Sequence, residues 1–296
     1  MTPRHAHLVG HLCGLGTAII WGFTFVSTKM AMNAGLSTFE TLFLRFAIAY
    51  VALWLIRPRL PKWNGWRSEW PFVVCGACGV SFYYLLEYSS LLFTSASFVT
   101  IICALGPLFV SVAMWIVYRR RPTWQFFVGF MLATAGTVLV VTAGGVGLQV
   151  TLFGTLLALA GNVLWANYCV IVRRTDEGDG ADTILSIRRI FFWGLVTLAP
   201  FVLFYGFDVS DVNFLAPDVL VSLLVLGLLA SSAAYILYSL STRLIGEGKT
   251  SIYLYFPPAI GSVAAFFLLG ESIAAAGIVG IIAIIAGLII SQRGTQ

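Results

Sequence analysis

Long apolar runs, each about 20 residues in length, recur along the chain and are separated by short polar segments. A continuous run of this length is enough for a helix to cross the hydrocarbon core of a bilayer. The strands of an outer-membrane barrel would instead alternate apolar and polar residues over shorter segments. We therefore predict an all-α integral membrane protein with ten transmembrane helices, at roughly 9–32, 38–56, 71–92, 96–118, 124–144, 152–172, 184–206, 219–242, 250–269 and 274–291.

Two of the predicted helices combine a polar face with proline. A proline inside a helix removes one backbone hydrogen bond and clashes with the preceding turn, so each of these helices is expected to bend or break. The polar face follows the spacing i, i+4, i+7 and i+11 in both, with Thr100, Ala104, Pro107 and Ser111 in the first and Ser251, Tyr255, Pro258 and Ser262 in the second. We predict that Pro107 and Pro258 act as hinges.

The two halves of the chain repeat one another. At a common offset of 151 residues, Tyr84 matches Tyr235, Pro107 matches Pro258, Gly129 matches Gly280 and Gly136 matches Gly287. Trp21 and Trp165 also occupy matching points of the first and sixth predicted helices. Because each half contains an odd number of helices, the second half must enter the membrane in the opposite orientation. We predict two inverted five-helix repeats, residues 1–146 and 147–296, with a binding site near the midplane where they meet.

Composition and charge support a membrane protein and orient it. The 296-residue chain is 59% hydrophobic and 10% charged, whereas a soluble domain carries about 25% charged residues. If the N-terminus is cytoplasmic, 15 of the 17 Lys and Arg residues lie at the inner side. Short cytoplasmic loops are enriched in these residues. We therefore predict a multi-pass protein of the bacterial inner (plasma) membrane with both termini in the cytoplasm.

Several polar aromatic and amide side chains fall well inside the predicted helices. Such groups need polar partners in hydrocarbon, and a wet central cavity would supply them to all at once. The alternative is that they pack helices or form interfacial belts, as we expect for Trp63, Trp66 and Trp70. The residues that we predict to line the cavity and bind substrate are Trp21, Tyr84, Tyr88, Asn162, Trp165, Tyr235 and Tyr255.

Lys29, Arg45 and Glu87 are charged residues inside predicted helices, and Glu40 begins the second helix nearby. A charge at this depth is costly unless it is paired, so we expect a cluster of mixed sign. Three roles remain open: a network that fixes the helices, a receptor for a substrate carboxylate at Arg45 or Lys29, and a proton-coupling carboxylate at Glu87.

The sequence lacks the residues that buried histidine relays, metal sites, nucleotide binding or thiol redox chemistry would need. The three histidines, His5, His7 and His11, all lie near the N-terminus, and no phosphate-binding glycine loop occurs. Cys75 and Cys78 form a C-x-x-C pair without a second dithiol to relay electrons. We expect no catalytic residue, metal, cofactor or nucleic-acid partner. The matched glycines favour packing within one molecule over a dimer seam, so we expect a functional monomer in the bilayer.

The sequence resembles the EamA-type members of the drug/metabolite transporter superfamily. The resemblance rests on A-I-I-W-G-F-T-F at Ala18–Phe25, on F-L-R-F-A-I-A at Phe43–Ala49, on the two proline-containing helices and on G-E at Gly270–Glu271. The first repeat departs from the pattern, with Arg120–Arg121 where many members carry Gly-Glu. L-W-A-N-Y-C at Leu164–Cys169 and Y-F-P-P at Tyr255–Pro258 are similar to the bacterial aromatic amino-acid exporters.

The resemblance implies a ten-helix fold of two inverted repeats and a secondary transporter that works by alternating access. It implies export of a small metabolite, and we expect an aromatic or other hydrophobic amino acid. The alternative is a broad-specificity, proton-coupled exporter of amphipathic drugs or metabolites. A membrane-embedded enzyme or scaffold is a more remote alternative.

Overall fold

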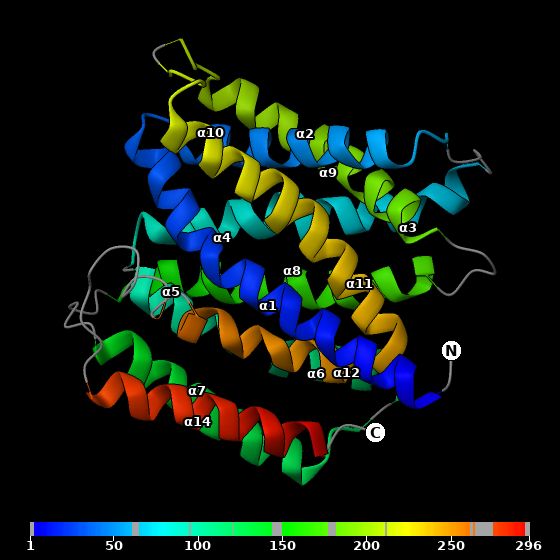
Figure 1. The fold of residues 1–296 in the computed structure, drawn as a ribbon, viewed down its shortest axis with the longest axis vertical. Coiled ribbons are helices and arrows are strands. Elements are labelled where there is room, and N and C mark those ends of the chain that lie inside the picture. The colour runs from blue at the N-terminus through cyan, green and yellow to red at the C-terminus, as the bar shows by residue number, and fades with distance from the viewer. Residues whose placement is uncertain are drawn as a thin grey trace.

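The computed structural model is a bundle of helices in every part of the chain that it describes (Figure 1). It describes residues 3–60, 65–94, 96–119, 121–143, 150–176, 182–210, 212–260, 263 and 275–293. The elements of the first half are α1 (Pro3–Asn33), α2 (Thr38–Ile56), α3 (Trp66–Gly76), the π-helix η1 (Ala77–Phe82), α4 (Tyr83–Leu91), α5 (Ala96–Cys103), α6 (Gly106–Tyr118) and α7 (Trp124–Ala143). Those of the second are α8 (Leu152–Asp176), α9 (Thr183–Tyr205), α10 (Pro217–Leu224), the π-helix η2 (Val225–Ala233), α11 (Ala234–Ile245), α12 (Glu247–Ser251), the 3₁₀-helix η3 (Ile252–Tyr255) and α14 (Ala275–Arg293).

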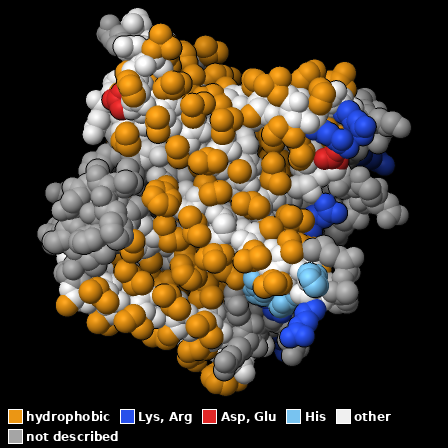
Figure 2. Space-filling view, viewed as in Figure 1, with side chains coloured by type: hydrophobic (Ala, Val, Ile, Leu, Met, Phe, Trp, Pro, Cys, Tyr) orange, Lys and Arg blue, Asp and Glu red, His pale blue; other side chains and the backbone are white. Residues whose placement is uncertain are grey.

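Eight helical segments are long and apolar enough to cross a membrane. They correspond to the first eight predicted helices, and Ala275–Ser291 forms a shorter apolar helix at the position of the tenth. The predicted ninth helix is described only as far as residue 260 and at residue 263. Large hydrophobic side chains such as Leu203, Met131 and Ile282 are more than half exposed, and hydrophobic side chains cover most of the face drawn in Figure 2. This is the surface that lipid contact requires.

Both ends of the chain lie at one end of the bundle, where α1 begins and α14 ends (Figure 1). We call this the terminal end. On the face drawn in Figure 2, Lys, Arg and His side chains gather at the terminal end, with hydrophobic side chains over the middle. The distribution agrees with the charge asymmetry that the sequence shows.

The contact between α7 and α14 has the form that two-fold symmetry requires. A Cβ atom on Gly136 would lie 2.6 Å from the carbonyl oxygen of Gly280, and one on Gly280 would lie 2.6 Å from that of Gly136. Gly129 and Gly287 meet in the same reciprocal way, at 2.3 and 2.6 Å. Gly280 is the counterpart of Gly129, and Gly287 is the counterpart of Gly136. Gly129 thus contacts the counterpart of Gly136, and Gly136 contacts the counterpart of Gly129. The two equivalent helices therefore run antiparallel, as inverted repeats require.

A similar reciprocal contact joins the third predicted helix of each half to the second predicted helix of the other half. A Cβ on Gly76 of α3 would clash with backbone atoms of Gly194 in α9, and one on Gly227 of η2 would clash with Ile48 in α2. The hydrogen bonds follow the same pattern. The Ser81 hydroxyl donates to the carbonyl of Gly194 at 2.7 Å, and the matching Ser232 hydroxyl donates to that of Ala49 at 3.4 Å. Each half thus packs its third helix against the second helix of the other.

Both third helices are widened by a π-helix, which the sequence analysis did not predict. η1 and η2 end at residues 82 and 233, which are again 151 residues apart. A π-helical turn inside an α-helix is rare, and it changes which side chains share a face. Tyr83 and Tyr84, the first two residues of α4 directly after η1, both line the same cavity.

The proline-containing segments are both interrupted. The first breaks at Ala104 and Leu105, between α5 and α6, and Pro107 lies in the first turn of α6. The second passes from α12 through η3 before residues 256–260 resume an α-helix. At the common offset, Ala104 corresponds to Tyr255, so the two breaks occupy matching positions. The predicted bend or break is present in both segments, whereas motion about Pro107 and Pro258 stays a prediction.

The glycine contact between α7 and α14 can be tested by stability. Gly129→Ala places a Cβ against the Gly287 carbonyl and Ser291, so the two helices must move apart. We expect the free energy of unfolding in detergent to fall by about 1–3 kcal/mol. Gly161→Ala is the control, because its Cβ would come no closer than 3.7 Å to another residue. Thermal or denaturant unfolding of the two variants measures this, and equal stability would contradict close packing of α7 on α14.

Candidate functional site

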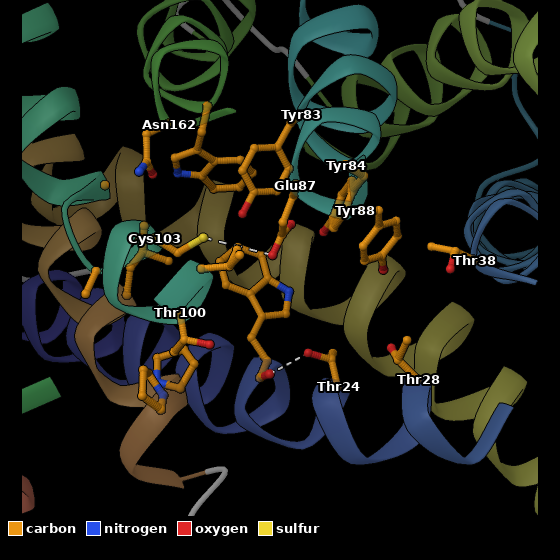
Figure 3. Close-up of a pocket in the computed structure, with 18 of the residues that line it drawn as sticks. Thr24, Thr28, Thr38, Tyr83, Tyr84, Glu87, Tyr88, Thr100, Cys103 and Asn162 are labelled. Atoms are coloured by element: carbon orange, nitrogen blue, oxygen red, sulfur yellow. Dashed lines mark hydrogen bonds between the residues drawn. The ribbon is translucent and has the colours of Figure 1, made fainter. Parts of the chain in front are cut away.

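A cavity of about 660 Å³ lies between α1, α2, α4, α8 and the two interrupted segments (Figure 3). Thr24 and Thr28 enter it from α1, and Tyr83, Glu87 and Tyr88 enter it from α4. The opposite wall comes from the break between α5 and α6 and from residues 254–258. Elements of both halves of the chain therefore build one site.

Aromatic side chains from both halves form the bottom of the cavity. We name Trp21, Trp165, Tyr168, Tyr235 and Tyr238 the aromatic floor. Trp21 and Trp165, which match in the repeat, meet edge to face with ring centroids 5.7 Å apart. Trp21 also contacts Tyr235 at 5.8 Å and Tyr238 at 5.6 Å. Edge-to-face pairs of this kind stabilise the fold by more than the burial of their apolar area alone would.

The aromatic floor closes the cavity toward the terminal end. One turn beyond Trp165, Cys169 is fully buried and its Sγ lies 3.4 Å from the Tyr238 hydroxyl. That hydroxyl donates to the carboxylate of Glu247, a buried residue of α12. Toward the opposite end, the lining includes Met32 and Leu92, whose exposed fractions are 46% and 81%. Among the described residues, the cavity is thus sealed at the terminal end and reaches the opposite end.

Arg45 supplies a buried positive charge to the cavity. Its Nε donates to the Ser231 hydroxyl at 2.9 Å, and its Cζ lies 5.1 Å from the ring centroids of Phe46 and Tyr84. Tyr88 also faces the guanidinium. These contacts are hydroxyl groups and two ring faces, so they hold the side chain in place without neutralising its charge.

Glu87 supplies the opposite charge, one turn from Tyr83 and Tyr84. Its carboxylate lies beside the Tyr83 hydroxyl (Figure 3), and its Oε1 lies 4.0 Å from the Sγ of Cys103. Glu87 and Arg45 attract each other electrostatically, yet no ion pair joins them in the part of the chain that the structure describes. The two charges therefore face one cavity without cancelling each other in direct contact.

Asn162 connects α8 to the break between α5 and α6. Its Nδ2 donates to the carbonyl oxygen of Ile102 at 2.7 Å. Ile102 also accepts from the backbone of Leu105 at 3.0 Å. Gly106 follows the break and comes close to the Asn162 side chain, since a Cβ there would lie 3.3 Å from Oδ1. The amide of α8 thus supports backbone groups that the interruption exposes.

The structure brings many of the sequence-predicted site residues to this cavity. Those that line it are Trp21, Arg45, Tyr84, Glu87, Tyr88, Asn162, Trp165 and Pro258. Tyr235 is buried directly beneath, in the aromatic floor, and its hydroxyl donates to the carbonyl of Gly79 at 3.1 Å. Pro107 follows the lining residue Gly106 in α6.

Four residues lie elsewhere or outside the description. Tyr255 is fully buried away from the cavity, against Phe130 of α7, because η3 turns its side chain toward the α7–α14 pair. Glu40 caps α2 in a capping box with Ser37 and accepts from the backbone of Asp208 at 2.8 Å, so its charge is used at the helix end. The side chain of Lys29 lies outside the described residues, as does Ser262.

Sequence reasoning missed several lining residues. Tyr83 lies four residues before Glu87 in the regular helix α4, so the two share a face, and the sequence did contain this signal. Thr24 and Thr28 continue the face of Trp21 at i+3 and i+7, a signal that the sequence did contain. Thr100 and Cys103 lie in the last turn of α5, on the wall opposite α1.

Cysteine accessibility tests the shape of the cavity. Cys103 lines the cavity, whereas Cys169 lies beyond the aromatic floor and is fully buried. We expect a protein that retains only Cys103 to react with a charged methanethiosulfonate reagent at least about tenfold faster than one that retains only Cys169. Mass spectrometry after timed labelling measures the two rates. Equal rates would show that the aromatic floor does not separate the two cysteines.

Comparison with known proteins agrees with the fold. The EamA-like transporter family matches the chain twice, over residues 8–142 and 152–292. An uncharacterized transporter of Archaeoglobus fulgidus is 28% identical over 88% of this chain and 89% of its own length. A probable terminal-alkyne amino-acid exporter of Streptantibioticus cattleyicolor is 26% identical over 94% of this chain and 92% of its own length.

A solved crystal structure shares the fold with a TM-score of 0.77, at 18% identity, over 99% of this chain and 98% of that one. The double family match and the likeness in fold both extend over nearly the whole chain. With its apolar helices, its reciprocal repeats and its central cavity, this chain is a multi-pass membrane protein that belongs to the EamA-like transporter family.

Proposed function

We propose that this chain is a secondary transporter of the bacterial inner membrane that exports amino acids with aromatic or other hydrophobic side chains. The observation that carries the proposal is the cavity itself. It is built by both repeats, closed at one end by the aromatic floor and, among the described residues, lined by the buried cation Arg45 and the carboxylate of Glu87. Ten membrane-spanning helices, in two inverted repeats, complete the proposed architecture, and the chain acts as a monomer.

The dimensions and chemistry of the cavity support an amino acid as substrate. A volume of about 660 Å³ lies in the range of small-molecule sites. The rings of Trp21 and Trp165 offer faces on which an aromatic side chain can stack. Arg45 offers a carboxylate the free donors of its guanidinium. The relative named as a terminal-alkyne amino-acid exporter is consistent with this substrate class.

The orientation of the protein follows from its positive charges. If the terminal end is cytoplasmic, as the positive-inside rule indicates, the cavity reaches the outer side of the membrane and the aromatic floor seals the inner side. The structure then corresponds to an outward-facing state. Export requires a second state in which the aromatic floor parts and the outer end closes.

The interrupted segments support motion between these two states. The break at Ala104 and Leu105 and the 3₁₀ turn at η3 lie at matching positions of the two repeats. A helix that lacks hydrogen bonds at its middle bends there at low cost. Pro107 and Pro258 keep these positions from closing into regular helix. We propose that the repeats rock about the cavity by bending there, as other inverted-repeat transporters do.

A proton-coupled exporter of amphipathic organic cations is the second candidate. Glu87 favours it, because a half-buried carboxylate beside aromatic rings suits both a proton and a cationic ligand. Arg45 opposes it, since its charge in the same cavity repels a cationic ligand. If Glu87 couples protons, Glu87→Gln removes the response of flux to a pH gradient.

Flux in proteoliposomes tests the proposed function. We expect labelled phenylalanine to cross the membrane only where the protein is present, and unlabelled tryptophan to compete with it. Trp165→Leu removes a ring from the cavity wall and should weaken phenylalanine affinity by about tenfold. Trp124→Ala, at an exposed position of α7, is the matched control and should leave the affinity unchanged.

The competing outcomes of this assay are distinct. Flux of a hydrophobic cation without flux of any amino acid would replace the proposed function with the second candidate. No flux of either class, with a correctly folded protein, would remove both candidates.

A further inference from the structure

The break between α5 and α6 leaves the backbone carbonyls of two cavity-lining residues without a backbone hydrogen bond among the described residues. Leu105 donates back to Ile102, and both Leu108 and Phe109 donate to Leu105. Pro107 has no N–H to donate. As a consequence, the carbonyls of Cys103 and Ala104 accept no backbone hydrogen bond in the described part of the chain. Both residues line the cavity.

These carbonyls lie where α5 ends, so they carry the partial negative charge of a helix C-terminus. An independent group adds to that charge. The Oε1 of Glu87 lies 4.0 Å from the Sγ of Cys103, on the adjacent wall (Figure 3). The carboxylate thus lies next to the residue that ends α5, and we name Glu87 together with the carbonyls of Cys103 and Ala104 the anionic pole.

The positive group of the cavity lies on the other side of Glu87. Figure 3 shows Cys103 on one side of the Glu87 side chain and Tyr84 and Tyr88 on the other. Arg45 contacts the ring of Tyr84 and the hydroxyl of Tyr88. The cavity thus has two poles of opposite sign above an apolar aromatic floor.

We propose that the anionic pole, Glu87 with the carbonyl oxygens of Cys103 and Ala104, receives the ammonium group of an amino-acid substrate. Arg45 and Tyr88 then take the carboxylate, and the substrate side chain rests on the aromatic floor. This inference rests on the proposed function and adds a group that discriminates amino acids from simple carboxylic acids.

The chemistry of an ammonium group fits these acceptors. An ammonium group carries three N–H donors and no acceptor, and the anionic pole offers a carboxylate and two carbonyl oxygens. Moving this charged group out of water costs much free energy unless an opposite charge pairs with it. A ligand with a carboxylate but no amine would satisfy Arg45 and leave Glu87 facing a second negative charge. Such a ligand is rejected by repulsion as well as by missing contacts.

The anionic pole belongs to the first repeat alone. At the offset of 151, Glu87 corresponds to Tyr238, whose hydroxyl donates to Glu247 on the far side of the aromatic floor. Cys103 and Ala104 correspond to Leu254 and Tyr255, and the side chain of Tyr255 packs toward α7. The symmetric scaffold therefore presents an asymmetric site, which is what a substrate with two different ends requires.

Three ligands distinguish the contribution of the anionic pole from that of Arg45. L-Phenylalanine has both charged groups, 3-phenylpropionate lacks the amine and phenethylamine lacks the carboxylate. Binding to purified protein is measured by calorimetry for wild type, Glu87→Gln and Glu87→Asp. The matched control is Asp218→Asn, which removes an exposed carboxylate in the first turn of α10. Thermal midpoints confirm that each variant is folded.

We expect wild type to prefer phenylalanine to 3-phenylpropionate, and Glu87→Gln to reduce that preference by about tenfold or more. Phenethylamine should lose affinity together with phenylalanine, Glu87→Asp should restore part of the preference, and Asp218→Asn should match wild type. Equal weakening of all three ligands, or no change in their ratio, would overturn the anionic pole and leave the proposed function standing. Failure of wild type to bind any of the three would overturn the proposed substrate and the anionic pole together.

Discussion

The contact between the two repeats at the centre of the molecule organises everything else in this protein. Trp21 and Trp165, equivalent residues of the two halves, meet edge to face there. The equivalent Tyr84 and Tyr235 lie beside them. In hydrocarbon, the polar atom of a buried indole or phenol group usually has a hydrogen-bond partner. Trp21 finds one in the carbonyl of Ala230, and Tyr235 in that of Gly79, which match at the common offset. The aromatic floor is therefore both the seam of the repeats and the closed end of the cavity.

The same constraint explains why irregular backbone and charge gather above that seam. Unpaired carbonyls and ions are tolerated at membrane depth only where they line a polar space. The break between α5 and α6 frees carbonyls at the cavity wall, while Arg45 and Glu87 are held there by hydroxyls and rings. Features that would destabilise an ordinary membrane helix thus become the polar groups of the site. The glycine contact of α7 with α14, on the far side, supplies rigid packing that these interruptions do not weaken.

Much of this organisation could be predicted from the sequence, because it depends on the length of apolar runs and on the spacing of residues along the chain. Apolar run length marks the helices, the offset of 151 marks the repeats, and stripes of polar and aromatic residues place Tyr84, Asn162 and Trp165 at one cavity. The failures have local causes. η1 and η2 have no simple sequence signature, so the sequence does not predict them. Tyr255 shares the polar face of a regular helix, but η3 rotates it toward Phe130. Glu40 was grouped with the intramembrane charges although a capping box already engages it.

The central claim is that the aromatic floor opens while the open end of the cavity closes, and the reverse, during transport. Spin labels at Met32 and Leu92 report on the open end, and labels at the exposed residues Arg67 and Arg243 report on the terminal end. Pulsed electron–electron resonance in lipid nanodiscs, on a background without native cysteines, measures both distances with and without phenylalanine. The account predicts a population in which the first distance shortens and the second lengthens together. Active protein in which both distances stay unchanged would contradict it.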